Sequence, residues 1–332
     1  MTAGAPTAHR QPICTTNRFD AMTQTITLAL FSRSYDLSFL KPLLERADPL
    51  LDVVVWPDPR CGQAQVAVGW DAPEGLYERM PKLRLIHSVA AGVDNLIAGQ
   101  DLRGAAVCRV VDPLLAEGML QYVLWAVLHF HRRLDAALAN QPRRRWHRPE
   151  QIPARDCRVG LMGLGEMAAR IVAVLPALGY TVNGWSRTPR QLHGVTTWSG
   201  PQGLPPFLAA TDVLVCLLPL TGHTRGILCA QTFAALPRGA ALVHCGRGEH
   251  LVEADLAQAL ASGQLRGAVI DVFQHEPLLE DHPFWNMPGV IVTPHMATMA
   301  GFDAVVEQVA CNVARLRGDQ PLLNRIDPQR GY

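Results

Sequence analysis

The sequence predicts an α/β protein built on two doubly wound parallel sheets, and three observations predict it. Two successive series of short, β-rich apolar runs alternate with helical patterns along the chain, which is typical of parallel sheets covered by helices. The 332 residues correspond to about two domains of roughly 150 residues each. Hydrophobic residues make up 48 % of the chain and charged residues 18 %, so there is enough apolar material for two cores.

The charge balance and the hydropathy exclude several classes of protein. Lysine and arginine number 30 and aspartate and glutamate 29, and the resulting net charge of +1 provides no broad field for a nucleic acid. The apolar content excludes a disordered chain. Charge, glycine or proline interrupts every apolar stretch before about 18 residues, so we expect no membrane span.

The N-terminal segment and the cysteines indicate the cellular compartment. The first 21 residues are polar and lack the apolar run of a secretion signal, so we expect residues 1–21 to be a disordered extension. The eight cysteines form no C-x-x-C pair. The sequence therefore predicts reduced thiols, a cytoplasmic protein and no metal site.

The first series covers residues 26–111 and predicts five strands, with a helix over Leu37–Ala47. The strands are Ile26–Phe31, Leu51–Trp56, Gln65–Trp70, Leu83–Ser88 and Ala106–Val111. Apolar residues at helical spacing then predict one long helix from Leu115 to about Ala139. The basic connector Pro142–Pro149 is either a solvated loop, which short charge runs favour, or a phosphate-binding segment.

The second series begins at residue 158 and predicts a doubly wound sheet of six strands. We expect helices over Glu166–Leu178, over Glu253–Ser262 with an end at Gly263, and over Thr298–Leu316. The strands are Arg158–Met162, Thr181–Trp185, Val213–Leu218, Ala240–His244, Ala268–Phe273 and Val290–Thr293. From the pattern alone, the two series form two consecutive domains.

A dinucleotide-binding motif follows the strand Arg158–Met162. Gly163, Gly165 and Ala168 form G-x-G-x-x-A at the start of a helix. The first glycine permits a tight turn, the second lets a pyrophosphate approach the backbone, and the alanine leaves room for helix–strand packing. The helix N-terminus adds free N–H groups for the phosphates. A tight turn without a ligand is the alternative interpretation.

The residues after the next strand distinguish NAD from NADP. An NAD site usually has Asp or Glu about 20 residues after the glycines, but here Ser186, Arg187 and Thr188 follow the strand. Two hydroxyls and a guanidinium suit a ribose 2′-phosphate, because arginine binds phosphate in a bidentate manner. The sequence favours NADPH as the cofactor, and NAD is the alternative. An exposed turn whose arginine touches only water is the alternative.

Three candidate catalytic residues follow successive predicted strands. Arg247, Glu276 and His295 stand where ligands collect in open α/β sheets. This set suits reduction of a 2-oxo acid: the arginine holds the carboxylate, the histidine gives a proton to the carbonyl oxygen, and the glutamate orients the histidine and favours its charged form. Each residue alone has a purely structural explanation, so the prediction depends on the ordered set.

These motifs resemble the D-isomer-specific 2-hydroxyacid dehydrogenase family, and most closely its glyoxylate/hydroxypyruvate reductase A branch. The branch is indicated mainly by two motifs, Trp185–Thr188 and Arg330–Tyr332. The matching stretches are Ala90–Asn95, Gly163–Ala168, Trp185–Thr188, Leu218–Thr224, Gly246–Gly248, Asp271–Pro277, Thr293–His295 and Arg330–Tyr332.

The resemblance implies roles for further residues. Backbone amides of Ala91, Gly92 and Val93 would bind the substrate carboxylate together with Arg247, and Asp271 would contact the nicotinamide end of the cofactor. The complete set expected to bind the cofactor is Gly163, Gly165, Glu166, Met167, Ser186, Arg187, Thr188, Leu218, Pro219, Thr224, Cys245, Gly246 and Asp271.

The resemblance also implies a domain arrangement and a function. A Rossmann cofactor domain of residues 114–297 would be inserted in a flavodoxin-like catalytic domain of residues 22–113 and 298–332, and the long helix would support a homodimer. The expected reaction is NADPH-dependent reduction of small 2-oxo acids such as glyoxylate and hydroxypyruvate, with no nucleic-acid or membrane partner. A dehydrogenase of another 2-hydroxy acid and a non-catalytic NAD(P)-sensing interaction protein stay open as alternatives.

Overall fold

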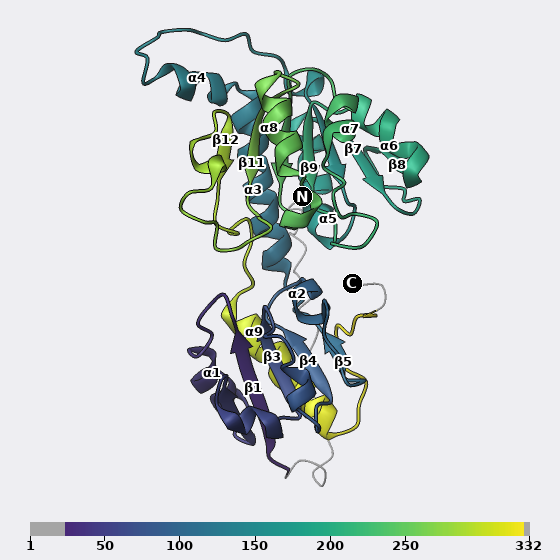
Figure 1. Ribbon diagram of the computed structural model, residues 1–332. Helices are drawn as coiled ribbons and strands as arrows, with labels where there is room; N and C mark the ends of the chain where they lie inside the picture. Colours follow the sequence, from purple (N-terminus) through teal and green to yellow (C-terminus); the bar gives the residue numbers. More distant parts are fainter. Residues whose placement is uncertain (1–23, 329–332) are drawn as a thin grey trace, which may run out of the picture.

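Two parallel sheets form two lobes in the computed structural model, which describes residues 24–328 (Figure 1). The first sheet has the strand order β2-β1-β3-β4-β5 and the second the order β12-β11-β10-β9-β6-β7-β8. These are the flavodoxin-like and Rossmann orders of doubly wound sheets, so the predicted fold class is confirmed. The expected extension 1–21 and the motif Arg330–Tyr332 lie outside the described residues.

The first lobe packs a sheet of apolar strands between helices. Leu28, Val53 and Val66 have no exposed surface, as expected for parallel strands that are covered on both faces. Its strands β1 to β5 are Ile26–Ser32, Leu51–Val55, Val66–Trp70, Leu85–Ser88 and Ala106–Cys108. Its first two helices are α1 (Leu40–Ala47) and α2 (Asp94–Ile97).

The C-terminal helix α9 (Phe302–Arg317) completes this first lobe (Figure 1). It packs against α1 and places Val305 and Val309 in the core of the five-stranded sheet. The Arg317 guanidinium lies 2.7 Å from the Asp48 carboxylate in a largely buried ion pair. Segments from both ends of the chain therefore share one core.

The second lobe contains the seven-stranded sheet. Its strands β6 to β12 are Arg158–Met162, Thr181–Ser186, Val195–Ser199, Val213–Cys216, Ala240–His244, Leu265–Ile270 and Val290–Val292. Its helices α3 to α8 are Pro113–His131, Leu134–Asn140, Glu166–Val174, Gly200–Ala209, Ala230–Ala235 and Glu253–Ala261. The chain adds β7 and β8 on one side of β6 and β9 to β12 on the other, which creates a crevice for ligands between β6 and β9.

The strand prediction for this lobe was wrong in two details. The sheet has seven strands rather than six, because Val195–Ser199 forms the edge strand β8. All five of its residues are at least partly exposed, so it lacks the apolar run by which a buried strand is recognised. In addition, β11 covers Leu265–Ile270 instead of Ala268–Phe273, since the chain leaves the sheet after Ile270.

Two helix predictions also need correction. The long helix expected from Leu115 to Ala139 is divided into α3 and α4, because Arg133 adopts a left-handed conformation with φ 57°. The expected helix Glu166–Leu178 ends as α5 at Val174, and Pro176 begins a short 3-10 turn. By contrast, Gly263 follows α8 with φ 70°, as the end predicted there requires.

The basic connector Pro142–Pro149 lies at the surface beyond α4, and its Trp146 side chain is fully exposed. This is the environment expected of a solvated loop. Within residues 24–328, no helix is both long and apolar enough to cross a membrane. None of the seven cysteines in the same range forms a disulfide.

Candidate active site

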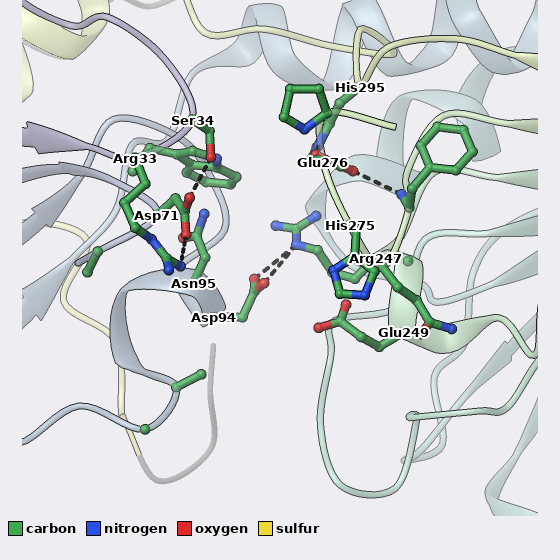
Figure 2. A pocket seen from close by; sticks show the side chains of 18 of the residues that line it. Arg33, Ser34, Asp71, Asp94, Asn95, Arg247, Glu249, His275, Glu276 and His295 are labelled. Carbon is green, nitrogen blue, oxygen red and sulfur yellow. Dashed lines mark hydrogen bonds and ion pairs between the residues drawn. The ribbon is translucent and has the colours of Figure 1, made fainter. Parts of the chain in front are cut away.

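The three predicted catalytic residues follow neighbouring strands at one edge of the second sheet. The loops after β10, β11 and β12 carry Arg247, Glu276 and His295, respectively. All three side chains line one cavity of about 850 Å³ whose walls come from both lobes (Figure 2). The fold therefore brings together the residues that strand-end positions suggested.

The His295 imidazole and the Glu276 carboxylate form a hydrogen-bonded pair in this cavity. Nδ1 of His295 lies 2.7 Å from Oε2 of Glu276, and both side chains are 23 % exposed. The second oxygen of Glu276 accepts a 2.9 Å hydrogen bond from the Phe273 backbone N–H. A carboxylate partner keeps the hydrogen on Nδ1, so Nε2 is the ring nitrogen available to a ligand.

The backbone of His295 is held in an uncommon left-handed conformation, with φ 51°. Its N–H donates to the carbonyl oxygens of Asp271 and Thr293 at 2.9 and 3.0 Å. The Asp271 carboxylate accepts the Thr293 hydroxyl at 2.6 Å and the backbone N–H groups of Met296 and Ala297 at 2.9 Å each. Strained conformations persist at functional sites when surrounding contacts over-determine them.

Asp271 was predicted to contact the nicotinamide end of the cofactor. Its side chain is only 1 % exposed, and the bonds just described connect it to the loop that carries His295. Burial is the main cause that raises the pKa of Asp271 above its usual value. In this structure the carboxylate holds the loop that carries His295 from inside the protein.

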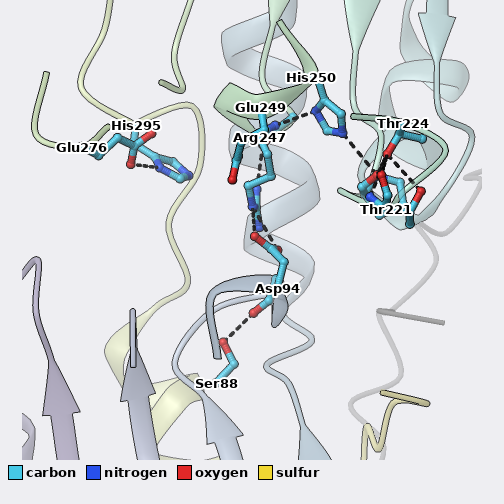
Figure 3. Close-up of polar contacts among 12 residues, drawn as sticks. Ser88, Asp94, Thr221, Thr224, Arg247, Glu249, His250, Glu276 and His295 are labelled. Carbon is cyan, nitrogen blue, oxygen red and sulfur yellow. Dashed lines mark hydrogen bonds and ion pairs between the residues drawn. The ribbon is translucent and has the colours of Figure 1, made fainter. Parts of the chain in front are cut away.

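Arg247 extends from the second lobe to the first. Its Nε donates to the two carboxylate oxygens of Asp94 at 2.9 and 3.1 Å (Figure 3). A Cβ atom on Gly92 would lie only 1.9 Å from Nη2 of Arg247, so glycine is needed for this close approach. The guanidinium thus lies against the loop whose amides were predicted to bind a carboxylate.

Trp70, the last residue of β3, contacts both functional groups from the first lobe. Its ring lies 5.9 Å from Cζ of Arg247 and 6.2 Å from the ring centroid of His295. A cation over an aromatic ring is favourable. Neither Trp70 nor Asp94 was among the predicted site residues, although Trp70 ends a predicted strand and Asp94 lies in the matched stretch Ala90–Asn95.

The cavity wall formed by the first lobe is polar. Asp71 accepts 2.5 Å hydrogen bonds from the Arg33 guanidinium and the Ser34 hydroxyl. Among the described residues, the lining includes neither the glycine-rich loop nor Ala91, Gly92 and Val93. These three residues follow β4 and immediately precede the lining residues Asp94 and Asn95.

The glycine-rich loop lies at the crevice where the strand order reverses. Gly163 has φ 108°, and a Cβ there would lie 2.9 Å from the Leu217 carbonyl oxygen. A Cβ on Gly165 would meet no protein atom within 4 Å among the described residues. This open space adjoins the N-terminus of α5, which begins at Glu166 and Met167. The arrangement fits a pyrophosphate.

The segment after β7 lies beside the glycine-rich loop. The hydroxyl of the buried Ser186 donates to the Thr188 carbonyl at 2.8 Å, whereas Arg187 and Thr188 are exposed. Nη1 of Arg190 donates to the Leu164 carbonyl at 2.9 Å, which connects the two segments. Residues 186–190 contain no carboxylate.

The other predicted cofactor residues lie in two loops that meet. Leu218 and Pro219 follow β9, and the Thr224 hydroxyl donates to the Pro219 carbonyl at 2.7 Å. Cys245 and Gly246 follow β10, and a Cβ on Gly246 would lie 3.3 Å from the Leu218 carbonyl oxygen. Burial raises the pKa of the Cys245 thiol, so this side chain is uncharged near pH 7.

Comparison with known proteins identifies the family. A profile described as "D-isomer specific 2-hydroxyacid dehydrogenase, NAD binding domain" matches residues 124–297. The chain belongs to this family. Its members bind NAD(P), so the protein is an NAD(P)-binding oxidoreductase of the 2-hydroxyacid dehydrogenase class. The resemblance drawn from the motifs is therefore confirmed.

Several relatives are similar to this family member over almost its whole length. Glyoxylate/hydroxypyruvate reductase A of Serratia proteamaculans (strain 568) is 34 % identical over 290 residues, which is 86 % of this chain and 93 % of the relative. A family protein of Xanthobacter autotrophicus Py2, solved with NADPH and MES, is 38 % identical with a TM-score of 0.84, covering 93 % of this chain and 100 % of that one. The NADPH-dependent glyoxylate/hydroxypyruvate reductase of Sinorhizobium meliloti, solved with NADP and sulfate, is 35 % identical with a TM-score of 0.84, covering 92 % and 100 %.

Proposed function

We propose that this 2-hydroxyacid dehydrogenase reduces small 2-oxo acids, such as glyoxylate and hydroxypyruvate, with NADPH. The observation that carries the proposal is the presence of Arg247, Glu276 and His295 around one cavity. The polar wall of that cavity suits small polar substrates. Relatives named glyoxylate/hydroxypyruvate reductase support the same substrate class.

The residues of the crevice fit the dinucleotide. Gly165 leaves the N-terminus of α5 open to the pyrophosphate, and Ser186, Arg187 and Thr188 would hold the 2′-phosphate of NADPH. Two similar structures were solved with NADPH or NADP. When bound, the reduced nicotinamide supplies the hydride for the carbonyl carbon of the substrate.

Arg247 binds and orients the substrate carboxylate in this proposal. Its Nε bonds to Asp94 and its Nη1 donates to the Gly246 carbonyl at 2.7 Å, so Nη2 faces the Gly92 loop. Charge-assisted hydrogen bonds from this group, together with the amides of Ala91, Gly92 and Val93, fix the carboxylate. Because these contacts hold the substrate in one orientation, they lower the entropic part of the activation barrier.

His295 is the proposed proton donor. The Nε2–H of its protonated ring gives a proton to the carbonyl oxygen, and the product is a 2-hydroxy acid. Glu276 holds the ring through Nδ1 and stabilises the imidazolium before transfer. Trp70 packs beside both His295 and Arg247, which helps to exclude water from the reacting atoms.

An absorbance assay of cofactor oxidation tests the proposal. The protein is incubated with NADPH or NADH and a panel of glyoxylate, hydroxypyruvate and longer 2-oxo acids. We expect turnover with the small acids and a higher kcat/KM with NADPH. The absence of cofactor oxidation with every acid would contradict the proposed reaction and favour an NAD(P)-sensing protein.

We also propose that the protein is a homodimer. Helix α3 exposes three large apolar side chains, those of Leu114, Trp125 and Leu128, and a second copy of the chain would cover them. Light scattering coupled to size-exclusion chromatography should give twice the chain mass. Substituting Trp125 with glutamate should shift the protein toward the monomer, and a monomeric wild type would contradict the proposal.

A further inference from the structure

The backbone of Arg247 is held on both sides by buried histidines, His244 and His250. The Arg247 N–H donates to Nδ1 of His250 at 2.9 Å (Figure 3). The Arg247 carbonyl lies 2.9 Å from Nε2 of His244. Neither histidine has any exposed surface. The Arg247 carbonyl also accepts the backbone N–H of His250 at 2.9 Å, so two histidine side chains and one short 3-10 turn together fix the main chain of the arginine.

The glycines that flank Arg247 restrict the backbone further. A Cβ on Gly246 would lie 2.6 Å from Nδ1 of His250, and a Cβ on Gly248 would lie 1.9 Å from the Phe273 carbonyl carbon. The segment is thus packed between His250 and the loop that leads to Glu276. A shift of the arginine backbone would need both neighbours to move.

The hydrogen bonds assign one neutral tautomer to each ring. His250 accepts at Nδ1, so its Nε2 carries the hydrogen and donates to the Pro219 carbonyl at 3.2 Å. His244 donates from Nε2 to the Arg247 carbonyl, and its Nδ1 has no hydrogen-bond partner within residues 24–328. Burial lowers the pKa of His250 to about 4 and that of His244 to about 3, so both rings are neutral near pH 7.

Packing alone does not explain these two imidazoles. A buried polar atom without a partner, such as Nδ1 of His244, destabilises the folded state, and an apolar side chain would avoid that cost. What the imidazoles provide, and an apolar side chain cannot, is the pair of hydrogen bonds to the Arg247 backbone.

We propose that His244 and His250 are positioning residues that set the direction of the Arg247 side chain toward the substrate carboxylate. The proposal rests on the proposed role of Arg247. The two rings act only through the arginine backbone and touch neither substrate nor reacting atoms. Replacing either histidine should misplace the guanidinium relative to Gly92 and Asp94. Replacing His244 should also leave the cofactor crevice intact.

A metal site is the competing explanation of this cluster. Cys216, His244 and His250 place one ligand atom each within 4.8 Å of one another. However, both nitrogens of His250 and one of His244 already bond to the backbone, which leaves the Cys216 thiol and Nδ1 of His244. Structural zinc usually takes four protein ligands, so two available atoms suit the backbone role better.

The first experiment compares apolar and conservative variants of the full-length protein. His244→Leu and His250→Leu remove the bonds to Arg247, whereas His244→Gln keeps a donor near Nε2 and His250→Asn keeps an acceptor near Nδ1. We expect each leucine variant to lose about 100-fold in kcat/KM for the 2-oxo acid, as for a misplaced binding group, and the conservative variants to recover most of it.

A binding measurement complements the kinetics. In the leucine variants, the Kd of the carboxylate probe oxamate, measured by calorimetry with NADP bound, should rise by a similar factor. The Kd of His244→Leu for NADPH should not change.

His131 supplies the matched control. It is also buried, and its two ring nitrogens bond to the Tyr180 hydroxyl and the Ile152 carbonyl, remote from Arg247 in sequence and in contacts. His131→Leu should lower the Tm about as much as the other leucine substitutions but leave kcat/KM and oxamate binding unchanged. An equal loss of kcat/KM in this control would overturn the proposal, because it would show a general stability effect.

A double-mutant cycle and a crystal structure test the route of action. If His244 acts through Arg247, the variant Arg247→Lys with His244→Leu should be no less active than Arg247→Lys alone; additive losses would refute the proposal. The crystal structure of His244→Leu should show the guanidinium moved away from Asp94, and an unmoved guanidinium would also refute it. The crystal structure of His244→Leu tests the positioning role without any enzyme activity. A wild type that is inactive on every 2-oxo acid would therefore contradict only the proposed function.

Metal analysis decides the competing explanation. The purified wild type should contain no stoichiometric metal, and Cys216→Ala should keep its activity and its Tm in the presence of a chelator. A stoichiometric metal that is lost from Cys216→Ala or from His250→Leu would overturn the positioning role.

Discussion

At the residue scale, His295 is fixed through both its ring and its backbone. Glu276 bonds to the ring, and Asp271 and Thr293 accept the His295 backbone N–H. Fixing the imidazole in this way places Nε2 in the cavity before a substrate arrives. Preorganised groups of this kind need little rearrangement in the transition state.

His295→Ala should therefore lower kcat by about 10²- to 10⁴-fold at neutral pH, the range typical for loss of a general acid. The Kd for NADPH, measured by fluorescence titration, should stay unchanged. Glu276→Gln should give a smaller loss, because an amide oxygen can still accept from Nδ1 but does not stabilise the imidazolium. Near-normal turnover of His295→Ala would show that another group donates the proton.

We expect Arg187 to select NADPH and the neighbouring Arg190 to support the binding of either cofactor. Arg187→Ala should raise KM for NADPH much more than KM for NADH, because only NADPH carries the 2′-phosphate. Arg190 instead bonds to the Leu164 carbonyl in the glycine-rich loop, so Arg190→Ala should weaken both cofactors alike and serves as the control. Steady-state kinetics with each cofactor measure this, and equal effects of Arg187→Ala on the two would contradict the 2′-phosphate contact.

The meeting of the three predicted catalytic residues around one cavity could be predicted from the sequence, because local rules locate each of them. Arg247, Glu276 and His295 each follow a strand, and the carboxyl ends of parallel strands meet at one edge. Trp70 and Asp94 were missed because their importance arises from contacts across the two lobes, which no local pattern encodes.

At the element scale, the two glycines of the cofactor loop have different physical roles. Gly163 needs glycine for its positive φ and for its approach to the loop after β9, whereas no described protein atom within 4 Å of a Cβ at position 165 requires glycine there. We therefore expect Gly165 to matter for a ligand. Stability and cofactor binding can therefore be separated by substituting one or the other.

Gly163→Ala should lower the free energy of unfolding by about 1–3 kcal/mol, as expected for a strained non-glycine conformation. Gly165→Ala should change it by less than about 1 kcal/mol but raise the Kd for NADPH about tenfold or more, which is about 1.4 kcal/mol. Urea denaturation and fluorescence titration measure the two quantities. A destabilised Gly165→Ala with normal NADPH affinity would refute this division of roles.

The elements themselves were predictable where they are buried. Each core strand is a short apolar run, whereas β8 is an exposed edge strand without such a run. The break between α3 and α4 at Arg133 has no glycine or proline to mark it, so propensity could not indicate it.

At the scale of the whole molecule, the Arg247–Asp94 ion pair connects the two lobes. Asp94→Asn should raise KM for the 2-oxo acid roughly fivefold, about 1 kcal/mol for a charge-assisted bond at a partly exposed site, and leave the Kd for NADPH unchanged. Asp52→Asn, in the same lobe and with a side chain that is 44 % exposed, is the matched control. A KM of Asp94→Asn equal to that of the control would show that the contact does not support substrate binding.

The buried histidines make the stability of the whole molecule depend on pH. Burial lowers the pKa of His87, His244 and His250 to about 4, 3 and 4, whereas unfolded histidine titrates near about 6.5. Between these values the unfolded chain binds protons that the folded chain does not, so the stability present above pH 6.5 is lost as pH falls. Each group should remove about 2 kcal/mol of unfolding free energy between pH 7 and pH 5.

Urea denaturation at several pH values between 7 and 5 measures this dependence. The combined variant His244→Gln with His250→Asn should show a shallower slope of stability against pH, because two of these three histidines are gone. A wild-type stability that does not change over this interval would mean that the three histidines are not held neutral by the fold.

The packing of α9 on the first lobe has a consequence for protein synthesis. The strands β1 to β5 are translated before the second lobe, yet α9, which covers part of their apolar surface, is translated after it. The lobe made first must therefore finish folding last, while the later lobe can close around its own core beforehand. During translation the nascent chain exposes the side chains that will pack against Val305 and Val309, and chaperones have that interval in which to shield them.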